Sequence, residues 1–163
     1  MRQFQTVLLG LMLFMPAVCF GQGKCPWINE ATARGILGGD VTVNTKLSGE
    51  GEGVCTFSRQ QGARTEMLRI SVNILGDIPK QFPTYLAQCP AKSAALWAIG
   101  NEAIACSTES KEEPYAEKVV GRVRNQAFVV SVSSSVRDDA SMTQEMRRER
   151  ANRVAEQIAG FLF

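Results

Sequence analysis

The side chains that could do chemistry in this chain are carboxylates, serines, lysines and arginines, because its 163 residues include no histidine. That absence excludes a Ser-His-Asp triad, a Cys-His pair, an HExxH metalloprotease and a three-histidine zinc site. The cysteines form no C-x-x-C pair, so the sequence indicates neither a zinc ribbon nor a thioredoxin-type motif. We therefore expect no metal and no cofactor.

Carboxylates are the first candidates for catalysis. Glu102, in the segment Gly-Asn-Glu-Ala, is suited to general acid-base work if a second carboxylate lies beside it. Glu109, Glu112 and Glu113 follow within the next eleven residues, but no spacing fixes a pair. A structural role for Glu102, accepting backbone hydrogen bonds at a turn, is the interpretation we favour.

Two further patterns resemble catalytic or binding motifs. The serines at 133–135 and Lys118 could supply a nucleophile and a base, but serines at the end of a strand are usually loop residues. The stretch GEGEG at 49–53 has the glycines of a phosphate loop, yet it carries two carboxylates and precedes a strand, so we interpret it as a hairpin loop. We predict no catalytic residue, and the protein is not expected to be an enzyme.

A basic stretch near the C-terminus is the candidate interaction surface. It consists of Arg147, Arg148, Arg150 and Arg153. On a helix these arginines could bind an acidic partner or anionic lipid head groups. The alternative, which we favour, is a solvated helix face with ion pairs to neighbouring glutamates. Trp27 and Trp97 are expected in the core or against a disulfide, and not as stacking platforms for a ligand.

Composition and charge describe an ordinary globular protein. Hydrophobic residues make up 45% of the chain and charged residues 21%, with a formal net charge of +2. These values exclude collagen-like and disordered classes. A nearly neutral chain also gives no reason to expect a nucleic acid as partner.

The N-terminus has the pattern of a secretory signal peptide. A charged start precedes an apolar run at 7–18 that is shorter than the roughly 20 residues needed to span a bilayer, and Pro16 interrupts it. We assign residues 1–21 to the signal peptide, with cleavage after Cys19 as a second candidate, and expect a secreted or periplasmic protein with no membrane span. Acylation of Cys19 stays open, although Val18 stands where a lipoprotein signal has a smaller residue.

Four cysteines remain after removal of the signal peptide, and they are Cys25, Cys55, Cys89 and Cys106. An even number in an exported chain is typical of a disulfide framework. Three pairings are possible. We favour the sequential one, because Cys25 just precedes the first predicted helix and Cys55 lies in a strand expected to pack beneath it.

Hydrophobic periodicity predicts the element that ends the chain. From Met142 onward apolar residues recur every three or four positions, which predicts an amphipathic helix of about 20 residues. Asp138, Asp139 and Ser141 mark its start, and Gln144 would complete a capping box with Ser141. Before it, β-branched runs at 117–123 and 127–132 predict a hairpin.

Upstream segments predict further strands and two short helices. Strands are expected at 54–59 and 67–75, with an edge strand at 40–47, and Asn29 should cap a short helix that ends at Gly38. Prolines restrict a second helix to 82–89. The apolar run at 96–106 is interpreted as a strand interrupted at Gly100, and the segment 107–116 as an exposed polar loop.

This order predicts one α+β domain over residues 22–163. We expect an antiparallel β-sheet covered by a short N-terminal helix and a long C-terminal helix, stapled by disulfides. The chain resembles a group of small exported proteins and lipoproteins of unknown function with a Mog1/PsbP-like α/β/α sandwich. The resemblance rests on Cys25-Pro26-Trp27, Ile36-Leu37-Gly38-Gly39, Cys55-Thr56-Phe57, Ile99-Gly100-Asn101-Glu102-Ala103, the hairpin and the terminal helix. It implies a fold and an extracytoplasmic address, and no activity.

The sequence therefore favours an exported, non-enzymatic binding or interaction module whose partner is an unknown protein or small molecule. A structural accessory subunit of a cell-envelope complex is the alternative. A small carboxylate-dependent hydrolase is a third hypothesis.

Overall fold

The structure is a computed structural model that describes residues 24–49, 51–90 and 92–163. The predicted signal peptide, Cys19 and the expected new N-terminus at Gln22 lie outside these residues. Three helices and seven strands follow one another within the described residues. They are α1 (Glu30–Leu37), β1 (Thr42–Gly49), β2 (Glu52–Gln61), β3 (Arg64–Ile74), α2 (Ile78–Leu86), β4 (Ala94–Ala95), β5 (Glu102–Thr108), β6 (Ala116–Val123), β7 (Gln126–Ser134) and α3 (Gln144–Leu162).

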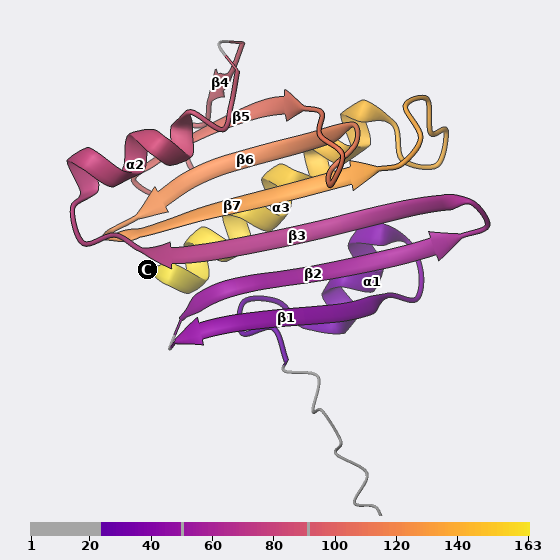
Figure 1. The fold of residues 1–163 in the computed structure, drawn as a ribbon, viewed down its shortest axis with the longest axis horizontal. Coiled ribbons are helices and arrows are strands. Elements are labelled where there is room, and N and C mark those ends of the chain that lie inside the picture. The colour runs from indigo at the N-terminus through magenta and orange to yellow at the C-terminus, as the bar shows by residue number, and fades with distance from the viewer. Residues whose placement is uncertain (1–23, 50, 91) are drawn as a thin grey trace, which may run out of the picture.

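The seven strands form one antiparallel sheet in the order β1-β2-β3-β7-β6-β5-β4 (Figure 1). The predicted α+β class is confirmed. β3 and β7 are distant in sequence and adjacent at the centre of the sheet, so the β1–β3 half joins the β4–β7 half there. The predicted edge position of the first strand is also confirmed.

Alternation along the strands separates the two faces of the sheet. Leu68, Ile70 and Val72 of β3 and the even-numbered Phe128 and Val130 of β7 belong to the main core, together with residues of α1 and α3. α3 packs on β6 and β7, and α1 on β2 and β3. A second, smaller core forms between α2 and the opposite face, where α2 lies in front of the sheet in Figure 1.

The described residues contain two disulfides, Cys25–Cys55 and Cys89–Cys106, which is the expected sequential pairing. The first joins the segment before α1 to β2. The second joins the segment after α2 to β5. Each bridge therefore ties a segment next to a short helix to a strand of the sheet.

The helix ends agree with the sequence for α1 and differ for the others. Asn29 caps α1, and its side chain accepts from the backbone N–H of Thr32 at 2.8 Å. The capping box expected at Ser141 is wrong, because Thr143 is the N-cap of α3. α2 begins at Ile78, four residues earlier than predicted, because Pro79 in a first turn lacks only an N–H that would be unpaired there.

Three expectations about residues 96–116 are wrong: the extent of the strand, the burial of Trp97 and the full exposure of the loop. Residues 97–101 form a turn, so the strand predicted at 96–106 begins only at Glu102. Trp97 lies on this turn and is 95% exposed, whereas Trp27 is buried as expected. The loop after β5 is not fully exposed either, because Glu113 is buried.

Candidate ligand-binding site

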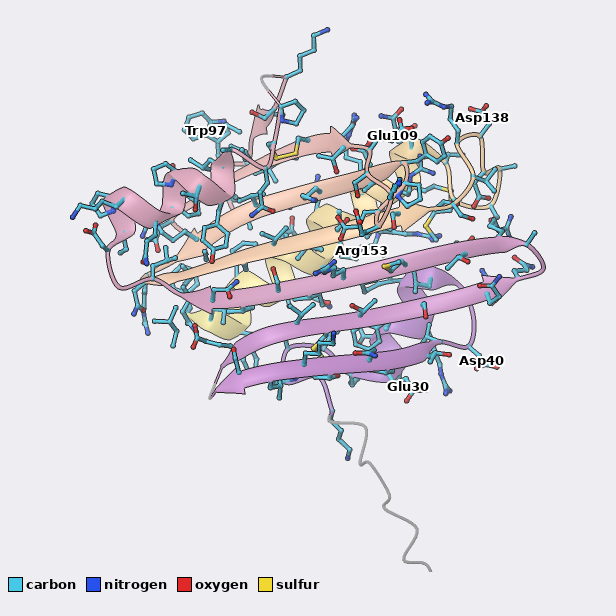
Figure 2. The ribbon with its side chains drawn as sticks, viewed as in Figure 1. Glu30, Asp40, Trp97, Glu109, Asp138 and Arg153 are labelled. Atoms are coloured by element: carbon cyan, nitrogen blue, oxygen red, sulfur yellow. A yellow bond between two sulfur atoms is a disulfide. The ribbon has the colours of Figure 1, made fainter. Side chains whose placement is uncertain are left out.

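A cleft of about 570 Å³ lies where β5 ends, β6 begins and α3 starts. Its volume is in the range of small-molecule sites. Glu109 and Asp138 mark this end of the molecule in Figure 2. Its lining residues include Ser107, Tyr115, Glu117, Arg137, Asp138 and Arg147.

Arg147 is the most unusual group in the cleft. The residue belongs to the first turn of α3 and is only 3% exposed. One guanidinium nitrogen donates to the carbonyl of Met142, and Nε has no hydrogen-bond partner within the described parts of the chain. No described carboxylate lies within 4.0 Å of it. Burial lowers the pKa of Arg147, against the nearby charges of Glu117 and Asp139, which raise it.

Glu117 is the buried carboxylate of the same cleft, and its hydrogen bonds are satisfied. Oε1 accepts from Ser107 at 2.6 Å and from Gln144 at 2.9 Å. Oε2 accepts from Nε of Arg148 at 3.2 Å. These bonds join β5, β6 and α3, so Glu117 fixes the cleft geometry and leaves little capacity for a ligand.

A second carboxylate, Asp139, closes the bottom of the cleft. It accepts from Arg64 at 3.0 Å, Ser134 at 2.8 Å and Ser141 at 2.7 Å. Burial alone would raise the pKa of Asp139, but the hydrogen bonds from Ser141 and Ser134, with the Arg64 charge, hold it below its ordinary value. Asp139 is therefore ionised and paired at neutral pH.

The rim of the cleft carries an aromatic ring and mixed charges. Arg137 donates to Glu109 at 3.3 Å, and its guanidinium carbon lies 4.8 Å from the centre of the Tyr115 ring. Asp138 is exposed beside them and has no ion-pair partner in the described ranges. The unpaired charges of the cleft are therefore one buried guanidinium and one exposed carboxylate.

The predicted basic stretch does not form one exposed surface. The expectation that its first arginine is exposed is wrong, because that residue is buried as described above. Arg148 pairs with Glu117, and Arg150 is partly buried against a methionine sulfur. Arg153 pairs with Glu149 at 2.6 Å on the helix surface, as ion pairs of this spacing were expected to do.

The candidate catalytic residues do not come together. Glu102 is exposed and lies 3.8 Å from Arg122, at the opposite end of β5 from Glu109. A strand of this length puts about 20 Å between them. Ser134 binds Asp139, and the residue opposite Lys118 on β7 is Ser131, outside the predicted serine run.

The glycine-rich stretch connects β1 to β2 as a hairpin, although Glu50 lies outside the described residues. Among the residues that the structure describes, no group of three or more metal-ligating side chains is found. Nor is any helix there both long and apolar enough to cross a membrane.

Comparison with known proteins does not indicate a function, so the proposal below rests on the cleft. No family model, no curated protein and no solved structure matches the chain. The resemblance to the Mog1/PsbP-like group stays a prediction.

Proposed function

We propose that the protein is an exported binding module, without catalytic activity of its own, that takes a small carboxylate ligand in the cleft at the start of α3. The observation that carries this proposal is the buried, unpaired guanidinium of Arg147. A buried charge without a direct ion pair is costly, and a ligand carboxylate would supply that partner. The cleft also lies at the positive end of the α3 dipole, which favours an anion.

The acidic residues that line the cleft restrict the class of ligand it can take. Glu109, Glu117, Asp138 and Asp139 all line the cleft, so a multiply charged anion is disfavoured. Asp138 is free to accept from a donor or a cationic group on the same ligand. We expect a small molecule with one carboxylate and one hydrogen-bond donor or ammonium group.

Export is the second part of the proposal. Two disulfides indicate folding in an oxidising, extracellular environment. The signal pattern at 1–21 supports the same location. The intact mass of the exported protein should correspond to a chain that begins near Gln22. A mass that includes residues 1–21, or a diacylglycerol on Cys19, would contradict it.

The binding proposal is tested by NMR titration of the folded, oxidised protein with acetate, glucuronate and a free dipeptide. Backbone amides of Ser107, Thr143 and Gln144 should shift with the dipeptide and glucuronate more than with acetate. Arg147→Met should abolish the shifts. Arg153→Met, which removes the same charge from the exposed face of α3, is the matched control and should leave them unchanged.

The folding of Arg147→Met is checked by its melting temperature. Because the wild-type guanidinium lacks an ionic partner, the variant should melt within a few degrees of the wild type. Equal shifts in both arginine variants, or none with any probe, would refute the proposed site.

An accessory subunit of a cell-envelope complex is the second candidate function, and the exposure of Trp97 favours it. A tryptophan that is 95% exposed is a typical centre of a protein interface. Trp97 lies beside β4, away from the Glu109 and Asp138 end in Figure 2, so the two functions use different surfaces. Loss of an envelope partner by Trp97→Ser but not by Arg147→Met would favour this candidate.

A further inference from the structure

A second polar cavity lies on the opposite face of the sheet from α3. It has a volume of about 180 Å³ and lies between the centre of the sheet, the end of α2 and the loop that connects β5 to β6. Its polar lining consists of Arg69, Ser71, Gln88, Glu113, Lys118 and Ser131. None of these residues lines the cleft at the start of α3.

The register of the sheet places three of these side chains in one row. Lys118 of β6 is directly opposite Ser131 of β7, and Ser131 is directly opposite Arg69 of β3. Directly paired residues of antiparallel strands project to the same face. Ser131 therefore stands between two cationic residues on the neighbouring strands, whose backbones lie about 5 Å away on either side.

Ser131 is the unexplained member of the row. The residue is 2% exposed, and its Oγ has no hydrogen-bond partner in residues 24–49, 51–90 and 92–163. A buried hydroxyl without a partner is rare, since burial removes its bonds to water. It lines the cavity and can donate to an oxygen placed there.

Glu113 occupies the space between the two cations. Its Oε2 lies 3.1 Å from Nζ of Lys118, and its Oε1 lies 3.8 Å from Nη1 of Arg69. Unlike the cations, it comes from a loop, which closes on itself through Ser110: the Glu113 N–H donates to Oγ, and the Ser110 N–H donates to the Glu113 carbonyl. Two cations and one carboxylate leave the cavity with one positive charge.

We infer that this cavity is an oxyanion site, and that Glu113 holds the place of a ligand carboxylate or phosphate in the free protein. In the bound form Arg69 and Lys118 pair with the ligand, and Ser131 donates its hydroxyl to it. Binding then requires the carboxylate of Glu113 to leave, which moves the loop at 109–115. This inference is independent of the proposed α3 cleft.

The test uses inorganic phosphate and acetate as probes in NMR titrations of the amides of Arg69, Lys118 and Ser131. Glu113→Gln removes the competing charge and should bind one of the probes about tenfold more tightly than the wild type. Adding Ser131→Ala to that variant should weaken binding about tenfold again. Preference for acetate over phosphate would identify a carboxylate ligand, and the reverse a phosphate ester.

Two controls separate the site from general electrostatics and from the α3 cleft. Glu109→Gln makes the same charge change in the same loop and should not change the affinity. Arg147→Met should also leave it unchanged. Equal gains in Glu113→Gln and Glu109→Gln, or no shift with either probe, would overturn the inference.

A measurement on the wild type keeps the test valid if Glu113→Gln folds poorly. Saturating probe should increase amide hydrogen exchange at 109–115, because binding displaces that loop. Unchanged exchange in a wild-type protein whose Ser131 amide shifts would contradict the displacement of Glu113.

Discussion

Nη1 of Arg64 lies 3.0 Å from Oδ1 of Asp139, although 75 residues separate them in the chain. Arg64 begins β3, and Asp139 lies in the loop that leads to α3. The contact is continued by Glu66, which is 1% exposed and pairs with Arg64 and with Arg59 of β2. This cluster attaches the β2–β3 hairpin to the loop that forms the bottom of the α3 cleft.

Asp139→Asn should destabilise the protein by about 2–3 kcal/mol, less than a fully buried pair because Arg64 is partly exposed. The loss arises because Arg64 loses its charged partner and the hydroxyls of Ser134 and Ser141 lose a charged acceptor. Urea unfolding measures it. Asp138→Asn, at the exposed neighbouring position, is the control and should change the free energy of unfolding by less than about 0.5 kcal/mol.

The stabilisation by Asp139 should also depend on pH. Its pKa is lower in the folded protein than the ordinary value of 3.8. The contribution is therefore fully present above the unfolded pKa and is lost as the pH falls through the folded pKa. As the pH falls below about 4, the free energy of unfolding of the wild type should therefore decrease more steeply than that of Asp139→Asn. Parallel stability curves for the two proteins would contradict the lowered pKa.

The sequence predicts most of the sheet and little of the site. The strands and the long helix could be predicted because the alternation of apolar and polar residues in strands and the 3.6-residue periodicity in helices are strong over ten residues or more, as in β3 and α3. The start of α3 could not be predicted in the same way, because a cap depends on the geometry of one turn. For α3 the hydroxyl of Thr143 accepts from the N–H of Met146, while the N–H of Ser141 donates to Asp139.

The buried charges did leave a signal in the sequence. Glu66 lies two residues before the core residue Leu68 and so on the same face of β3, and Glu117 is related to Val119 of β6 in the same way. Arg147 lies four residues before Ala151, on the buried face of α3. A charged residue in phase with an apolar pattern marks a buried ionisable group. Which charges meet was not predictable, because the Arg64–Asp139 pair depends on the joining of the two halves of the sheet and the Arg148–Glu117 pair on the packing of α3 on β6.

The two tryptophans should give separate fluorescence signals. Trp97 is 95% exposed and Trp27 is 5% exposed. Acrylamide should therefore quench about half of the emission readily, and Trp97→Ser should remove that component with almost no change in melting temperature. A stability loss in Trp97→Ser comparable to that of a core truncation would show that the side chain packs against the protein.

Gly121 of β6 lies against the ring of Phe128 of β7, so a side chain at position 121 has no space. A Cβ there would overlap Cζ of Phe128, a residue that is fully buried and directly opposite in the sheet. Gly121→Ala should cost about 2–3 kcal/mol in urea unfolding, since a close-packed core cannot move the ring without disturbing its neighbours.

Phe128→Leu in the same chain should relieve the clash, so the double variant should be more stable than the sum of the single losses predicts. Gly160→Ala is the control, because Gly160 lies in α3 with nothing within 4 Å of the added carbon, and it should stabilise the helix by up to about 1 kcal/mol. Strict additivity of Gly121→Ala and Phe128→Leu would mean that the ring does not lie over the glycine.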